Sequence, residues 1–255
     1  GMWLMMSPYR LRDAIGAGDA RNGRFTVKGD LAHFPFANDQ HGVFEIAAPV
    51  TGGVFTFDSH WPRAEAIATE LVFRGSGMSG HVTSAAIGGI PIANTDVKIA
   101  DMAATPAVLD IKGGANGALD DFLRFVATTP VNGWLDGFLG AAHGTGNARL
   151  AMSLTMPLDD ATKTRLAGEF TMPGNTLALG GDVPALASVQ GKLRFTMASL
   201  SSDDIAAEAF GGPLRLTLAT REGRIEAHAR GSARLEKLRE QFPFPLVDRL
   251  SGPAT

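Results

Sequence analysis

The sequence contains no cysteine among its 255 residues. This absence excludes disulfide bonds, thiolate chemistry and cysteine-ligated zinc. The net charge of −3 offers no basic footprint for nucleic acid or anionic lipid headgroups. No apolar run reaches the ~18 residues that a membrane-spanning helix needs, and the apolar cluster before Pro8 is too short for a secretory signal. Gly1 before Met2 indicates a segment excised from a larger protein.

Glycine and proline are frequent and divide the sequence into short segments. The chain has 31 glycines and 14 prolines, so turn signals recur throughout. Between the turns, apolar and polar residues alternate, as in Leu150–Met156 and Leu214–Leu218. Successive side chains of a strand point to opposite faces, so each such segment has one apolar and one polar face. The pattern predicts a mainly β protein with largely antiparallel strands.

Three segments show helical spacing instead. Residues 118–130 group four apolar side chains on one face and stop at Pro130. Residues 132–144 and 233–245 show a similar grouping of apolar side chains. We therefore expect a few short helices that cap or flank the sheet.

Two parts of the chain resemble each other. Ala86–Pro91 and Ala209–Leu214 both place a Gly-Gly pair between two apolar segments, and each is followed by an alternating strand that leads into an amphipathic segment. The likeness predicts internal repeat units at approximately 24–139 and 148–246. Because stacked units of this kind share one apolar core, we expect residues 1–255 to form a single β-rich segment of a larger protein.

The residue patterns give no candidate for catalysis. The segment "GSGMSG" at Gly75–Gly80 fits a dinucleotide-binding spacing, but an alternating strand follows it where that motif needs a helix. The six histidines have no metal-binding spacing. Adjacent acidic pairs such as Asp120 and Asp121 are better explained by the first turn of a helix. We predict no catalytic, cofactor or metal site.

Several short motifs occur in the same order as in a known family. They are "KGDLAHFPF", "GVFEI", "WPRAEAIATELVF", "TTPV", "LTMPLDD", "LASVQGKLRFT" and "AEAFGGPLRL", and they extend along nearly the whole chain. In these motifs the sequence resembles the central region of the YhdP branch of the AsmA-like proteins of Gram-negative bacteria.

The resemblance implies an extended, strongly curved antiparallel sheet, a gutter or half-barrel, with an apolar interior. It also implies a segment of a bridge-like lipid transfer protein, anchored in the inner membrane by a helix outside this chain. Such a protein is periplasmic, shields phospholipid acyl chains between the inner and outer membranes, and serves outer-membrane biogenesis. The expected partners are phospholipid acyl chains, adjoining β segments of the same full-length protein, and envelope proteins.

The alternating apolar residues then become candidates for the lining of a lipid groove. The alternative is a non-catalytic structural or interaction module of the cell envelope, in which the same residues form an ordinary packed core. The groove candidates are Phe55, Phe57, Leu71, Phe73, Val97, Ile99, Leu109, Ile111, Leu150, Met152, Leu154, Leu177, Leu179, Leu193, Phe195, Leu214, Leu216 and Leu218.

Overall fold

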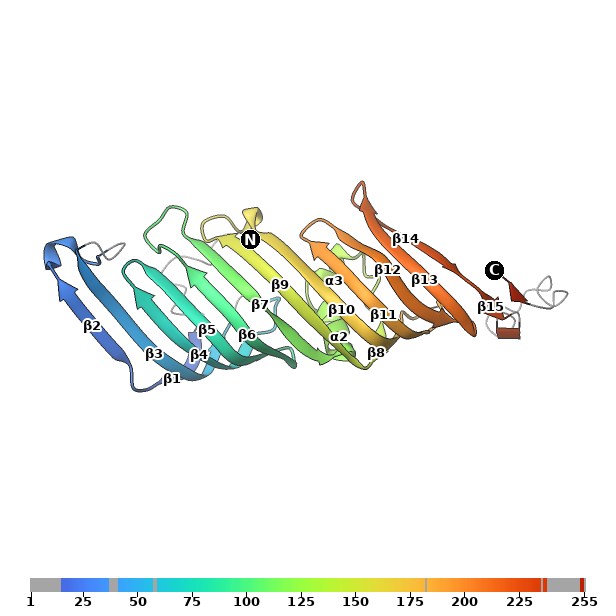
Figure 1. Cartoon of the computed structure of the whole chain (residues 1–255), viewed down its shortest axis with the longest axis horizontal. Helices are drawn as coiled ribbons and strands as arrows, with labels where there is room; N and C mark the ends of the chain where they lie inside the picture. Colours follow the sequence, from blue (N-terminus) through green and yellow to red (C-terminus); the bar gives the residue numbers. More distant parts are fainter. Residues whose placement is uncertain are drawn as a thin grey trace. The chain divides into compact units, whose positions relative to one another are not determined.

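The computed structural model describes residues 15–36, 41–56, 59–181, 183–234, 236–237 and 253–254. Their strands form an open antiparallel sheet of 14 strands, hydrogen-bonded in the order β1-β3-β4-β5-β6-β7-β9-β10-β11-β12-β13-β14 (Figure 1). In addition, β2 pairs with β3 and β8 pairs with β10, and a separate two-stranded sheet joins β15 and β16. A mainly β fold with an open antiparallel sheet and a few short helices is therefore confirmed.

The chain divides into two compact units, Gly1–Ala115 with Ala151–Ala167, and Asn116–Leu150 with Gly168–Thr255. Three strands have residues in both units: β7 (Val108–Ala118), β9 (Asn147–Pro157) and β10 (Arg165–Ala178). The other strands of the first unit are β1 (Ile15–Ala20), β2 (Arg24–Gly29), β3 (Gly42–Phe55), β4 (Ala64–Arg74), β5 (Gly77–Ile87) and β6 (Ile90–Ile99). Its 3-10 helices are η2 (Leu31–His33) and η4 (Ala161–Lys163).

The second unit contains two described α-helices. They are α2 (Leu119–Thr128) and α3 (Val131–Trp134). Its remaining strands are β8 (His143–Thr145), β11 (Leu186–Thr196), β12 (Leu200–Ala209), β13 (Gly212–Arg221), β14 (Arg224–Gly231), β15 (Ala233–Arg234) and β16 (Pro253–Ala254).

Each of the two Gly-Gly segments contributes to a tight hairpin turn. Gly88 and Gly89, with φ of 58° and 87°, join β5 to β6. Phe210 and Gly211, with φ of 51° and 73°, join β12 to β13. Two successive residues with positive φ give a two-residue turn whose twist matches that of the flanking strands. The predicted turns are confirmed, whereas the division into repeat units of 24–139 and 148–246 stays a prediction.

Helix α2 forms where the spacing of apolar residues predicted it. Its first turn carries Asp120 and Asp121, which suit the positive end of the helix dipole, and Arg124 binds both carboxylates at 3.0 and 2.9 Å. The chain leaves the helix at Thr129, immediately before Pro130. Its apolar side faces the sheet: the described residues buried within it are Leu119, Phe122 and Leu123.

The second predicted helix is much shorter than expected. Of residues 132–144, only the first three belong to α3, which ends at Trp134. Asp136 and Gly137 follow with φ of 50° and 74°, and left-handed residues cannot continue a right-handed helix. The third predicted helix, at 233–245, lies almost entirely outside the described residues.

Candidate functional site

In the first unit, the register of the strands gathers apolar side chains on one face. Residues that lie directly opposite each other in an antiparallel pair project to the same side of the sheet. One row crosses β3 to β7 as Ile46, Phe73, Met78, Ile99 and Leu109. The next row on the same side consists of Ala48, Leu71, Gly80, Val97 and Ile111. These two rows are called the first apolar face below.

The opposite side of the same strands carries charged and polar side chains together with a few apolar ones. Between the two apolar rows lies the row Ala47, Val72, Ser79, Lys98 and Asp110, whose side chains point the other way. Ion pairs link strands on this polar side: Arg24 of β2 reaches across β3 to Glu70 of β4 at 3.3 Å, and the neighbouring strands are joined by Arg74 with Glu45 at 3.3 Å and His81 with Asp96 at 2.7 Å.

The first apolar face is only partly covered. Ile99 is buried, with 4% of its surface exposed, but Leu71, Phe73, Val97 and Ile111 are half-buried. In a closed sandwich, a second layer of side chains would bury such residues almost completely. The half-buried residues therefore leave apolar surface that another apolar molecule can cover.

The second unit has the same two-sided construction. Gly191, Ile205, Leu216 and Ala229 lie opposite one another across β11 to β14. Rows on the same side include Ala207 with Leu214, and Ser202 with Leu218 and Ala227. These rows, together with Val189, Leu193 and Phe195, which alternate with Gly191 along β11, are called the second apolar face.

Part of the second apolar face is a packed core and part is not. Met172, Leu186, Val189, Ile205, Ala207 and Ala209 form a buried cluster. Leu193, Leu214, Leu216 and Leu218 pack against this cluster but stay half-buried. The polar side carries Lys192 with Glu169 at 2.7 Å, Arg194 with Asp203 at 2.9 Å, Arg215 with Asp204 at 2.6 Å, and Arg221 with Glu226 at 3.3 Å.

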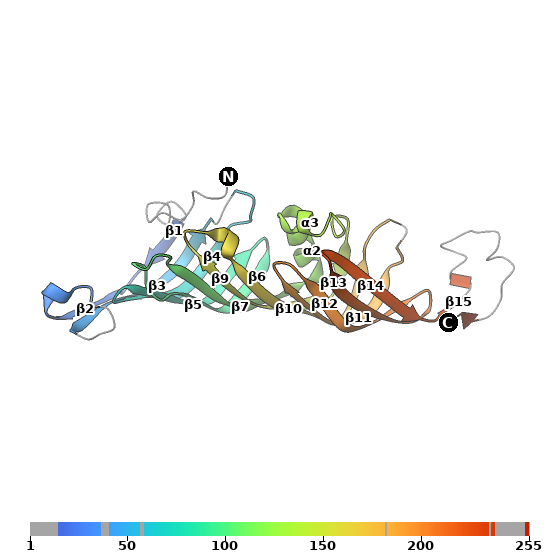
Figure 2. The same ribbon diagram turned by 90° about the horizontal axis from the view of Figure 1, so that it is seen from above.

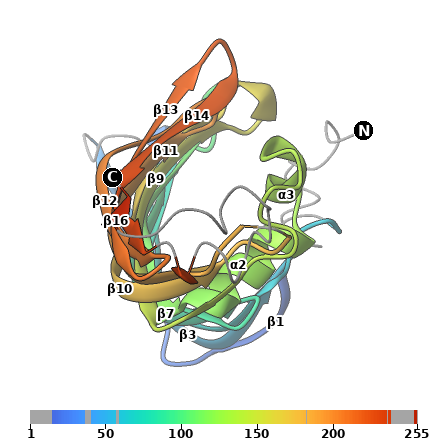
Figure 3. The same cartoon turned by 90° about the vertical axis from the view of Figure 1, so that its right-hand side faces the viewer.

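Helix α2 packs against β10, the strand next to the second apolar face. Figure 2 shows α2 and α3 on one side of the strands of this unit, and Figure 3 shows α2 beside β10. The ring of Phe122 contacts that of Phe170 edge to face, with centroids 5.1 Å apart. Phe170 in turn packs against the buried cluster. The helix therefore takes the place of a second layer over β10, and the strands beyond it keep their half-buried leucines.

The Asp120 carboxylate attaches α2 to β8. It accepts hydrogen bonds from the backbone N–H of Gly144 at 3.3 Å, from Arg124, and lies 3.4 Å from Nδ1 of His143. The Gly144 bond, followed by that of His143, lowers the pKa of Asp120 below its ordinary value of 3.8. Because these contacts favour the ionised form, their stabilisation is present above the pKa of the unfolded chain and is lost as the pH falls through the lower folded value.

Asn in place of Asp120 is expected to lower the Tm of the chain at pH 7. The difference from the unmodified chain should shrink as the pH falls below about 4. There the Asp120 carboxyl binds a proton in the unfolded chain before it does so in the folded chain, so the stabilisation by the ionised form is lost. Thermal unfolding followed by circular dichroism between pH 3 and pH 7 measures both effects. A Tm difference that is independent of pH would show that the charge of Asp120 does not hold the helix.

Most of the predicted groove residues lie on the two apolar faces. Leu71, Phe73, Val97, Ile99, Leu109 and Ile111 belong to the first, and Leu193, Phe195, Leu214, Leu216 and Leu218 to the second. Leu150, Met152 and Leu154 alternate along β9 with exposed residues, and the neighbouring Thr155 bonds Asp110 on the polar side. Leu177 packs against the buried cluster, Leu179 follows the end of β10, and Phe55 ends β3. Phe57 lies outside the described residues.

Sequence reasoning missed several members of these faces. Met78 and Ile46 belong to the first row, and Val189 and Ile205 form the floor of the second face. The alternation of Met78, Gly80 and Val82 was a usable signal, but glycine at its centre hides the apolar period. Whether any of these residues contacts lipid stays a prediction.

No helix among the described residues is long and apolar enough to cross a membrane. The family model described as "YhdP protein" matches residues 8–255. The chain is 27% identical over 215 residues to the protein named "Intermembrane phospholipid transporter YhdP" of Escherichia coli (strain K12), covering 84% of this chain and 16% of that relative. The chain thus spans about a sixth of the length of that relative. No solved structure matches it. By the family match over nearly its whole length, this chain belongs to the YhdP family.

Proposed function

We propose that this chain shields phospholipid acyl chains on its two apolar faces, as one segment of a bridge-like lipid transfer protein in the periplasm. The observation that carries the proposal is the division of each unit into two sides. Ion pairs between strands occupy one side, and half-buried leucine, isoleucine and phenylalanine side chains occupy the other. The name of the Escherichia coli relative supports phospholipid as the ligand and a position between two membranes.

The physical chemistry of such a face suits transport. Each buried methylene group stabilises a bound hydrocarbon chain by about 0.8 kcal/mol, and this attraction has no direction. A chain of about 16 carbons is therefore held without any specific polar contact. Successive rows of apolar residues offer nearly equal contacts, so the lipid can pass from one row to the next. The proposed activity requires no catalytic residue and no cofactor.

The edges of the sheet support a position within a longer assembly. All eight residues of β14 are exposed, and in the described sheet β14 pairs only with β13. The six residues of β2, which pairs with β3, are exposed as well. Free backbone groups at such edges can bind another strand. We propose that adjoining β segments of the full-length protein pair there and extend the apolar surface.

A photo-crosslinking residue at Leu154 or Phe195 tests the proposal in bacterial cells. We expect phospholipid adducts at both positions, because both side chains are apolar and half-buried. Ser153 and Gln190 are the matched controls, since they are exposed residues of the same strands. The readout is mass spectrometry of the purified adducts. Equal labelling at apolar and control positions, or none at either, would leave the structural module as the better explanation.

A further inference from the structure

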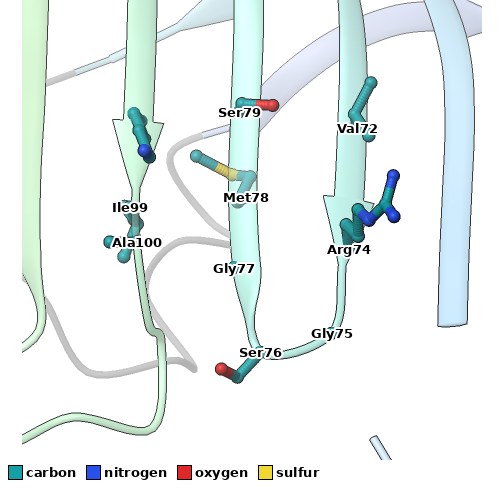
Figure 4. Close-up of a pocket in the computed structure, with 10 residues that line it drawn as sticks. Val72, Arg74, Gly75, Ser76, Gly77, Met78, Ser79, Ile99 and Ala100 are labelled. Carbon is teal, nitrogen blue, oxygen red and sulfur yellow. The ribbon is translucent and has the colours of Figure 1, made fainter. Parts of the chain in front are cut away.

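The glycine-rich hairpin between β4 and β5 borders a pocket that the proposed function does not use. The pocket has a volume of about 250 Å³. Figure 4 shows it at the turn where β4 ends and β5 begins, beside the end of β6. Its lining includes the polar residues Arg74, Ser76, Ser79 and Lys98 and the apolar residues Met78 and Ile99.

The polar side chains of this pocket can all donate hydrogen bonds, and three of them have no partner among the described residues. Among the described residues, neither the ammonium group of Lys98 nor the hydroxyls of Ser76 and Ser79 have a hydrogen-bond or ion-pair partner. Arg74 adds a second cation, and Glu45 binds its Nη1 at 3.3 Å. Asp110 lies opposite Lys98 on β7 and accepts a hydrogen bond from Thr155 at 2.7 Å. The pocket therefore offers one unpaired cation and two hydroxyls to an anionic ligand.

The register places these groups on adjacent strands around the hairpin. Ser79 lies opposite both Val72 and Lys98, whereas Gly77 lies opposite Arg74. Gly77 has no side chain to fill the polar side, and a Cβ atom there would lie 2.7 Å from the carbonyl oxygen of Ala100. Glycine at this position therefore lets the backbone at the end of β6 come close to β5, and Arg74 and Lys98 lie on the two strands that flank it. The pocket volume of about 250 Å³ is several times the ~30 Å³ that one water molecule takes in the liquid, so the pocket has room for a phosphate group.

Residues from both sides of the sheet line the pocket. Met78 and Ile99 belong to the first apolar face, and they line the same pocket as Ser79 and Lys98 of the polar side. The hairpin at Gly75 and Ser76 is the point at which a ligand can pass from one side to the other around the strand ends. A molecule with a phosphate group attached to acyl chains matches this arrangement, because it places charge and hydrocarbon on opposite sides.

We propose that Lys98, Ser76 and Ser79 bind the phosphate group of a phospholipid whose acyl chains lie on the first apolar face. This inference rests on the proposed function and adds to it a binding site for the lipid headgroup at the hairpin. An amine and hydroxyls that converge on one phosphate form charge-assisted hydrogen bonds, which are stronger than neutral ones. Inorganic phosphate shares this chemistry, so the test must separate the two sources.

The test compares the chain with the variants Lys98→Met and Lys112→Met. Methionine keeps the apolar stem of lysine and removes its charge. Lys112 is an exposed lysine on the polar side of β7, outside the pocket, and is the matched control. Calorimetric titrations use three probes: dihexanoyl phosphatidylglycerol, dihexanoylglycerol, which lacks the phosphate, and inorganic phosphate. Circular dichroism checks that both variants keep their strands.

We expect Lys98→Met to weaken the affinity for the phosphatidylglycerol about tenfold, and Lys112→Met to change it less than about twofold. Neither substitution should change the affinity for dihexanoylglycerol. If Lys98→Met weakens only inorganic phosphate, the pocket takes the free ion and the headgroup site is wrong. Equal effects of both substitutions, or none, also overturn it. If neither lipid binds the unmodified chain, the proposed function itself fails. If Lys98→Met loses affinity for the phosphatidylglycerol but still binds dihexanoylglycerol, the loss can come only from the headgroup site.

Discussion

Lysine in place of Leu216 is expected to abolish lipid capture on the second apolar face while the chain stays folded. Leu216 lies at the centre of this face, opposite Ile205 and Ala229, and is half-buried. A lysine there can extend its ammonium group from the open side into water, so we expect a loss of only about 1–2 kcal/mol in the free energy of unfolding. A hydrocarbon chain that covered this position would have to bury the charge, which costs several kcal/mol and lowers lipid capture at least tenfold.

Thr217→Lys is the control for this substitution. Thr217 is the next residue of β13, is exposed on the polar side and lies opposite His228. The same charge there should leave lipid capture unchanged. Photo-crosslinking at Phe195 provides the readout, with urea denaturation as the measure of folding. If Leu216→Lys unfolds the chain, the leucine belongs to a closed core. If the folded variant captures lipid normally, the second apolar face is not the path of the lipid.

Aspartate in place of Val189 is expected to have the opposite result, a loss of the fold. Val189 is 1% exposed and lies in the buried cluster with Met172, Leu186 and Ile205. A carboxylate at this position would have no cation within the cluster to pair with it. Burying an unpaired charge places the substitution among the most destabilising ones, with an expected loss of about 4 kcal/mol or more. Chemical denaturation followed by circular dichroism measures this loss.

Gln190→Asp gives the comparison for Val189→Asp. Gln190 follows Val189 in β11, is exposed, and lies opposite Ala206 on the polar side. The free energy of unfolding should change by no more than about 0.5 kcal/mol there. A loss below about 1 kcal/mol for Val189→Asp would mean that water reaches the cluster. The results for Val189 and Leu216 together separate the filled part of the second apolar face from the open part.

The strands could be predicted because their signal is local. Leu150, Met152 and Leu154 alternate with polar residues, and the same alternation is seen in their burial. Segments 118–130 and 132–144 both have helical spacing, but only the first became a helix of ten residues. The second stops after Trp134 because Asp136 and Gly137 adopt positive φ, which apolar spacing does not reveal.

The positions of residues on each face could be predicted less well. Face assignment depends on an unbroken period of two, and irregular residues interrupt that period. Ala66, Asn94 and Ser188 have φ of 51°, 49° and 52°, and the register shifts near each of them. A shift of one residue moves a side chain to the other side of the sheet. Residue type does not mark Ala66 and Ser188, because alanine and serine rarely adopt positive φ, whereas asparagine, as at Asn94, adopts it more often.

The sequence by itself determined that the chain builds antiparallel strands with one apolar and one polar side, since alternation is a property of consecutive residues. Its ordered motifs also determined the family. Only the tertiary structure decided which apolar residues are buried and which stay half-exposed. That outcome depends on partners distant in the chain. Phe122 of α2 covers Phe170, whereas Leu216 and Leu218 pack against the buried cluster and, among the described residues, make no ring contact of this kind with α2. The pocket at Gly77 likewise required the register that places Arg74, Ser79 and Lys98 around a residue without a side chain.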